Sequence, residues 1–113
     1  MSATVRFAAE LFLWADGSWH FVRLPDAAAE EVRDLADEAW HGPRRGFGSV
    51  KVRATIGVTS WGTSVFPEKE SGSFLLPVKK AVRAAEGIVA DDLVPVELEV
   101  EPDLGSGVEE GTP

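Results

Sequence analysis

Short runs in which apolar and polar residues alternate dominate this chain and predict β-strands. Between residues 48 and 57, apolar side chains at Val50, Val52, Ala54 and Ile56 alternate with polar ones. A period of two places each set on its own face of a strand. Comparable runs, rich in β-branched and aromatic residues, predict further strands over residues 4–14, 18–24, 60–66, 73–76 and 92–101.

Two other stretches repeat apolar residues every three or four positions, which is the spacing of one helix face. The first covers residues 26–40, starts at Asp26, a favoured N-cap residue type, and is followed by a Gly-Pro pair. The second starts at Pro77, which suits a first helical position, and ends at Gly87, which suits the left-handed position after a helix.

Six short strands with two inserted helices predict a mainly β domain, α+β by content. We expect a small closed or nearly closed six-stranded β-barrel with two short helices. Residues 1–101 are predicted to form this single domain, since the 113-residue chain fits one domain. Pro95 inside the last strand indicates an edge position or a bulge. Residues 102–113 have no periodicity and little apolar content, so we expect an acidic disordered tail.

The net charge of −8 is concentrated at one end of the chain. Residues 86–113 contain nine acidic residues and no Lys or Arg, whereas residues 1–85 hold all the basic residues and are close to neutral. No cysteine is present, which excludes disulfides, thiolate chemistry and cysteine-bound metals. Neither a signal peptide nor an apolar run long enough to span a bilayer is visible. We therefore expect a soluble cytoplasmic protein with no membrane partner.

Catalytic signatures are weak. The two histidines, His20 and His41, have no metal-ligand spacing, and the chain contains no Gly-x-Ser-x-Gly motif. Ser60 and Ser64 have no visible histidine partner. The sequence therefore predicts no catalytic residue, no metal ligand and no cofactor. An enzyme with a dispersed Ser/Asp/His site stays an alternative.

Basic residues in three segments are the strongest functional signal. If they converge beside Trp61, which we expect to be partly exposed, they would form a cationic groove with an aromatic edge. A scattered, solvated surface is the competing interpretation. The leading hypothesis is a non-enzymatic binding module for an anionic small molecule or peptide, or for a protein partner. The candidate ligand-binding residues are Arg45, Lys51, Arg53, Trp61, Thr63 and Lys79.

Several of these segments together resemble a known family. The runs are SWHFVRLP (18–25), RRGFGSVKVRATIGVTSWGTSVFP (44–67) and SFLLPVKKAVRAAEGIVADD (73–92). They resemble the small barrel family catalogued as domain of unknown function 1905, over residues 4–101. The resemblance implies a small β-barrel, present alone or beside a domain associated with bacteriocin resistance, and no catalytic residues. Many members carry Gly-Asp where this chain has Asp91-Asp92, so we expect that loop to tighten or shift.

A second, weaker similarity covers the C-terminal third. The run LPVKKAVRAAEGIVADDLVPVEL (76–98) is similar to swapped-hairpin transcription factors and antitoxins. It implies a nucleic-acid-binding regulator, which stays a further alternative. The acidity of the chain opposes this function, because neutralisation of phosphates supplies most of the affinity in such complexes.

Overall fold

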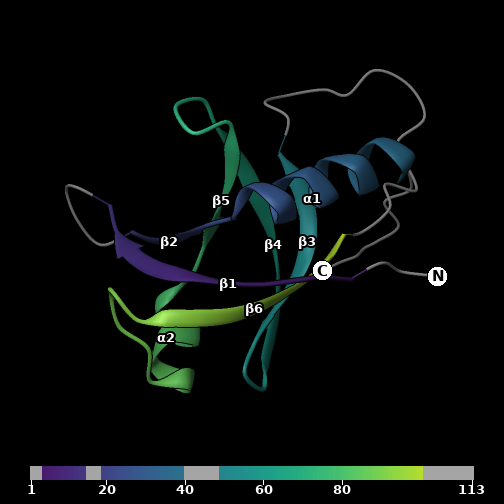
Figure 1. Cartoon of the computed structure of the whole chain (residues 1–113). Helices are drawn as coiled ribbons and strands as arrows, with labels where there is room; N and C mark the ends of the chain where they lie inside the picture. Colours follow the sequence, from purple (N-terminus) through teal and green to yellow (C-terminus); the bar gives the residue numbers. More distant parts are fainter. Residues whose placement is uncertain (1–3, 15–18, 40–48, 101–113) are drawn as a thin grey trace.

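The described part of the chain contains six antiparallel strands that close into a barrel. The computed structural model describes residues 4–14, 19–39 and 49–100, without the side chains of residues 37–39. The strands follow one another around the barrel in the order β1-β2-β5-β4-β3-β6, as Figure 1 shows. Their bounds are Thr4–Leu13 (β1), His20–Arg23 (β2), Val50–Ile56 (β3), Thr59–Glu68 (β4), Ser73–Pro77 (β5) and Leu93–Val100 (β6); the helices are Asp26–Ala39 (α1) and Lys80–Glu86 (α2). This architecture confirms the predicted fold class.

Two strands close the barrel by changing partners along their length. β1 pairs with β6 from Thr4 to Glu10 and then with β2 from Leu11 to Leu13. β5 pairs with β4 through its first three residues and with β2 through its last three. Each strand therefore bridges two parts of the wall.

The inner face of the wall follows the alternation seen in the sequence. On β3, the four apolar residues from Val50 to Ile56 are all buried. On β1, Val5 and Leu11 are buried in the same core. Leu13 has the same place in the alternation as Leu11 but is 49% exposed. It is the last residue of β1, at the end of the β1–β2 pairing.

The two helices cover different parts of the barrel (Figure 1). α1 buries Ala28, Ala29, Val32 and Ala36 and contacts β1, β5 and β6. α2 buries Val82 and contacts β4. Apolar faces on both helices thus extend the core past the strands.

The helix prediction is right for α1 and needs a correction for α2. Pro77 does not start α2, which begins at Lys80; it is the last residue of β5 and lies opposite Phe21 on β2. The backbone N–H of Val78 then donates to the carbonyl of His20 at 3.0 Å, so the chain stays extended beyond Pro77. Gly87 ends α2 with φ 64°, as predicted.

Two positions around β6 show how the barrel accommodates unusual residues. β6 lies between β1 and β3 and is not an edge strand, but Pro95 pairs with Ala8 outside the stretch that pairs with β3. Asp91 has φ 80°, a left-handed conformation that favours glycine. It occupies the position where the family resemblance implies glycine.

Candidate functional site

A depression lies on the barrel wall where β3 and β4 pair. Its volume is about 470 Å³. The register places Lys51 opposite Ser64 and Val52 opposite Thr63. Two neighbouring rungs of one strand pair therefore supply most of the lining. The full set of lining residues is Lys51, Val52, Gly62, Thr63, Ser64 and Phe66.

Gly62 keeps this part of the wall open. A Cβ atom placed on Gly62 would meet no other atom within 4 Å. Its partner across the strands is Arg53, and it shares the outer face with Ser64, two positions along β4. Glycine inside a strand lowers strand stability and often marks a place where a ligand or another backbone approaches. The missing side chain therefore leaves free space beside the outer face of β3.

The lining combines a cation, hydroxyl groups and an aromatic wall. Lys51 is exposed, and neither of the two ion pairs among the described residues includes it. Its ammonium group carries three donors, and the hydroxyl of Ser64, opposite Lys51 on the outer face, can donate or accept. Thr63 lies opposite the buried Val52, on the other face of the strand pair. The ring of Phe66 is 44% exposed. This arrangement suits a negatively charged group attached to an apolar body.

The ionisable and nucleophilic groups of this lining are limited to one amine and two hydroxyls. The lining contains no carboxylate, imidazole or thiol. Ser60, two positions before Gly62 on β4, shares a hydrogen bond of 2.7 Å with the hydroxyl of Thr55 on β3. Within the described residues, no group of three His, Cys, Asp or Glu side chains could hold a metal ion.

Three of the six residues proposed from the sequence lie together. Lys51 and Thr63 line the depression, and Arg53 lies on the same outer face of β3, opposite Gly62. On its other side Arg53 is paired in register with Glu99 of β6. An acidic neighbour lowers the positive potential around Arg53, so Lys51 is the principal cation at the depression.

The other three do not join this group. Trp61 was expected to be partly exposed, but it is only 8% exposed and packs in the core. It shares the inner face of β4 with Val65, because the two residues are separated by two whole strand periods. Lys79 comes two residues after the end of β5, on the side of the barrel where β5 pairs with β2, and does not line the depression. Arg45 lies outside the described residues.

Four lining residues were not proposed from the sequence: Val52, Gly62, Ser64 and Phe66. The alternation that buries Trp61 and Val65 places residues 62, 64 and 66 on the opposite face. The expectation that Trp61 is partly exposed is incompatible with this placement, so the sequence prediction missed these residues.

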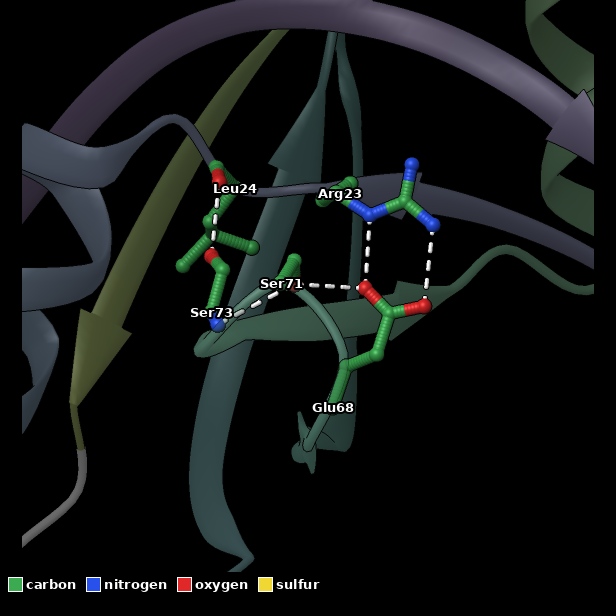
Figure 2. A network of polar contacts seen from close by, with 5 residues as sticks. All are labelled: Arg23, Leu24, Glu68, Ser71 and Ser73. Carbon is green, nitrogen blue, oxygen red and sulfur yellow. Dashed lines mark hydrogen bonds and ion pairs between the residues drawn. The ribbon is translucent and has the colours of Figure 1, made fainter.

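A separate polar network holds the wall together beside β5 (Figure 2). The Arg23 guanidinium donates to both carboxylate oxygens of Glu68, with Nε to Oε1 at 2.6 Å and Nη2 to Oε2 at 2.9 Å. The Ser71 hydroxyl also donates to Oε1 at 2.6 Å. These hydrogen bonds lower the pKa of Glu68 to about 2. None of the three residues lines the depression, so the network supports the wall.

No curated protein matches the sequence. In the part of the chain that the structure describes, no helix is long and apolar enough to cross a membrane. The similarity to swapped-hairpin regulators stays a prediction. Residues 7–98, which include both the depression and the polar network, match the model of one family, described as Domain of unknown function (DUF1905). The chain therefore belongs to the DUF1905 family.

Proposed function

We propose that this protein is a non-enzymatic binding module that holds an anionic small molecule or a peptide carboxylate in the depression between β3 and β4. The observation that carries the proposal is the Lys51 ammonium, which has no ion-pair partner among the described residues and lies beside the space left by Gly62. A bound carboxylate accepts hydrogen bonds from Lys51 and from the hydroxyl of Ser64. The apolar body of the ligand packs against Phe66.

The size of the depression favours a small ligand. Ligand pockets typically measure about 300–1,000 Å³, and this one is about 470 Å³. Nucleic acid is a poorer candidate, because a strand needs several cations along its path. On the outer face of β3, within the described residues, the cations are Lys51 and Arg53, and the residue paired with Arg53 on β6 is Glu99.

Thermal-shift and calorimetric titrations with benzoate, phenylacetate, a short acidic peptide and inorganic phosphate test the proposal. We expect an aromatic carboxylate to raise the melting temperature of the intact chain, because a ligand that binds only the folded state stabilises it. Lys51→Met removes the charge while retaining the length of the side chain, and should abolish the shift.

Gly62→Val provides an independent test that is insensitive to charge. A valine fits the open space and suits a strand, so this variant should fold at least as stably as the parent while filling the depression. We expect it to lose the ligand-induced shift. Lys69→Met, at another exposed lysine, is the matched control and should bind normally. If no probe produces a shift that depends on Lys51 and Gly62, the proposal is wrong.

A further inference from the structure

A cluster of aromatic rings lies on the outside of the β1–β2 pair, and we call it the aromatic face. It consists of Phe12, Trp14, Trp19 and Phe21. Trp19 stacks on Phe21 with ring centroids 6.0 Å apart, and Trp14 meets Phe21 edge-on at 5.5 Å. Trp19 is 63% exposed and Trp14 is 42% exposed. The rings thus form one apolar surface that faces solvent.

The position of this surface follows from strand alternation. Phe12 on β1 and Trp14, one residue past the end of β1, are two positions apart and face away from the core that holds Leu11. Phe21 has the same relation to the buried Val22 on β2. The aromatic face therefore contributes nothing to the inside of the barrel. Exposed apolar patches on small proteins mark interaction sites, and tryptophan is enriched in such interfaces.

Charged residues of opposite sign border the aromatic face on its two sides. Glu10 precedes Phe12 by two positions and is exposed on the β6 side, where it pairs with Leu93. Asp91 is exposed on the same side, and its backbone N–H donates to the carbonyl of Leu11 at 2.7 Å. These two carboxylates, one on β1 and one beside it, form an acidic border on the β6 side of the aromatic face.

The opposite border is basic. Pro77 lies opposite Phe21, and Val78 donates to the carbonyl of His20, so Lys79 is level with Trp19 on the far side of β2. Lys79 and the next residue, Lys80, are both exposed. Neither of the two ion pairs among the described residues includes any of the four border residues. Figure 1 shows β6 and β2 on opposite sides of β1 at this end of the barrel.

We infer that the aromatic face binds the same face of a second copy of this chain in a twofold-symmetric dimer. A twofold axis that lies in the interface and runs along the β1–β2 pair brings the acidic border of each copy against the basic border of the other. Glu10 and Asp91 then lie near Lys79 and Lys80 of the second copy. The aromatic rings of the two copies pack together in the centre and leave water.

The arrangement of charge favours a second copy over other occupants. A nucleic acid would bring its phosphates against Glu10 and Asp91, and a basic partner would meet Lys79 and Lys80. An identical surface offers the opposite charge at both borders. This site is distinct from the depression on β3 and β4, so neither proposal depends on the other.

Sedimentation equilibrium of the full chain tests the inference through the charge pattern. One variant, Lys79→Glu with Lys80→Glu, has acidic groups on both borders. The other, Glu10→Lys with Asp91→Gly, carries a basic group in place of the acidic border, and glycine suits the positive φ at residue 91. We expect a concentration-dependent dimer for the parent chain. Each variant alone should dimerise at least about tenfold more weakly, because like charges then face each other.

A mixture of the two variants is the decisive arm. In a heterodimer the acidic borders of one chain meet the basic groups of the other, so dimerisation should return in the mixture. Trp19→Ser should also weaken the dimer, and circular dichroism confirms folding because every substituted side chain is exposed. The inference is overturned if the parent chain is still monomeric at about 1 mM, where even a weak dimer would be detected. It is also overturned if either charge variant dimerises as the parent does, or if the mixture fails to recover.

Discussion

The carboxylate of Glu86 on α2 lies where a side chain on Gly57 would have to be. A Cβ atom at residue 57 would collide with Oε1 of Glu86. The other carboxylate oxygen accepts hydrogen bonds from the Thr59 hydroxyl at 2.5 Å and from the backbone N–H of Val58 at 3.3 Å. Gly57 also has φ 61°. The glycine therefore allows both the turn between β3 and β4 and its attachment to α2.

Gly57→Ala should destabilise the barrel. The left-handed backbone and the displaced carboxylate together predict a loss of about 1–2 kcal/mol in the free energy of unfolding. Glu86→Ala alone should cost about 1 kcal/mol through the lost hydrogen bonds. The double variant should lose less free energy of unfolding than the sum of the two single losses, since the alanine at residue 57 already displaces Glu86. Urea denaturation measures all three, and strictly additive losses would show that the two residues are independent.

The ion pair between Arg23 and Glu68 predicts a pH dependence of stability. The pKa of Glu68 falls from 4.5 to about 2 on folding, so its contribution is complete above about pH 4.5 and is lost as the pH falls toward 2. The Arg23 side chain is 44% exposed, so solvent screening limits this contribution to about 1 kcal/mol.

Glu68→Gln should therefore lower the free energy of unfolding at neutral pH, and the difference from the parent should shrink as the pH approaches 2. Urea denaturation across this pH range makes the comparison. Glu97→Gln, which breaks the more exposed pair with Arg6, is the matched control and should have a smaller effect at neutral pH. An unchanged difference between the parent and Glu68→Gln at every pH would contradict the assignment.

Asp91→Gly should stabilise the protein. Asp91 is the one non-glycine residue with positive φ in the described part of the chain. Relief of this conformation outweighs the greater freedom of glycine in the unfolded chain, for a net gain of about 0.5 kcal/mol. Asp92→Gly is the contrasting variant, because the Asp92 carboxylate accepts a hydrogen bond from the backbone N–H of Val89 at 2.9 Å. Thermal denaturation should show opposite shifts for the two variants, and a lower melting temperature for Asp91→Gly would refute the argument.

Ser73→Ala should be costly for so small a change. Ser73 is the buried polar residue of the described core, and its hydroxyl donates to the carbonyl of Leu24 at 2.7 Å (Figure 2). Removal of this donor leaves a buried carbonyl without that partner, at a cost of about 1–2 kcal/mol. Ser60→Ala removes a hydroxyl from an exposed pair and should change the free energy of unfolding by less than about 0.5 kcal/mol. Equal losses in the two variants would show that burial does not decide the cost.

Much of the fold could be predicted from short-range patterns. The predicted β3 span of 48–57 contains the observed Val50–Ile56, and the predicted helix over 26–40 contains the observed α1, Asp26–Ala39. These predictions succeed because alternation and helical periodicity depend only on neighbouring residues and on which face is buried. The start of α2 was predicted wrongly because the extended chain after Pro77 is held by pairing with β2, a segment more than fifty residues away.

The candidate site shows the same division. The alternation along β3 alone determined that Lys51 and Arg53 face outward, and both do. On β4, apolar and aromatic residues lie on both faces, so alternation alone does not tell which face is buried. Trp61 was therefore expected to be partly exposed. Only the closed barrel shows that its face is the inner one.

The amino-acid sequence by itself determined the six strands, the two helices and the outward basic residues of β3, because each depends on local periodicity. The tertiary structure alone decided which outward residues meet. The β3–β4 register brought Gly62, Ser64 and Lys51 into one depression. The switch of β5 from β4 to β2 moved Lys79 away from that depression and beside the aromatic face. Strand register and partner choice arise from closure of the whole barrel, which no local pattern encodes.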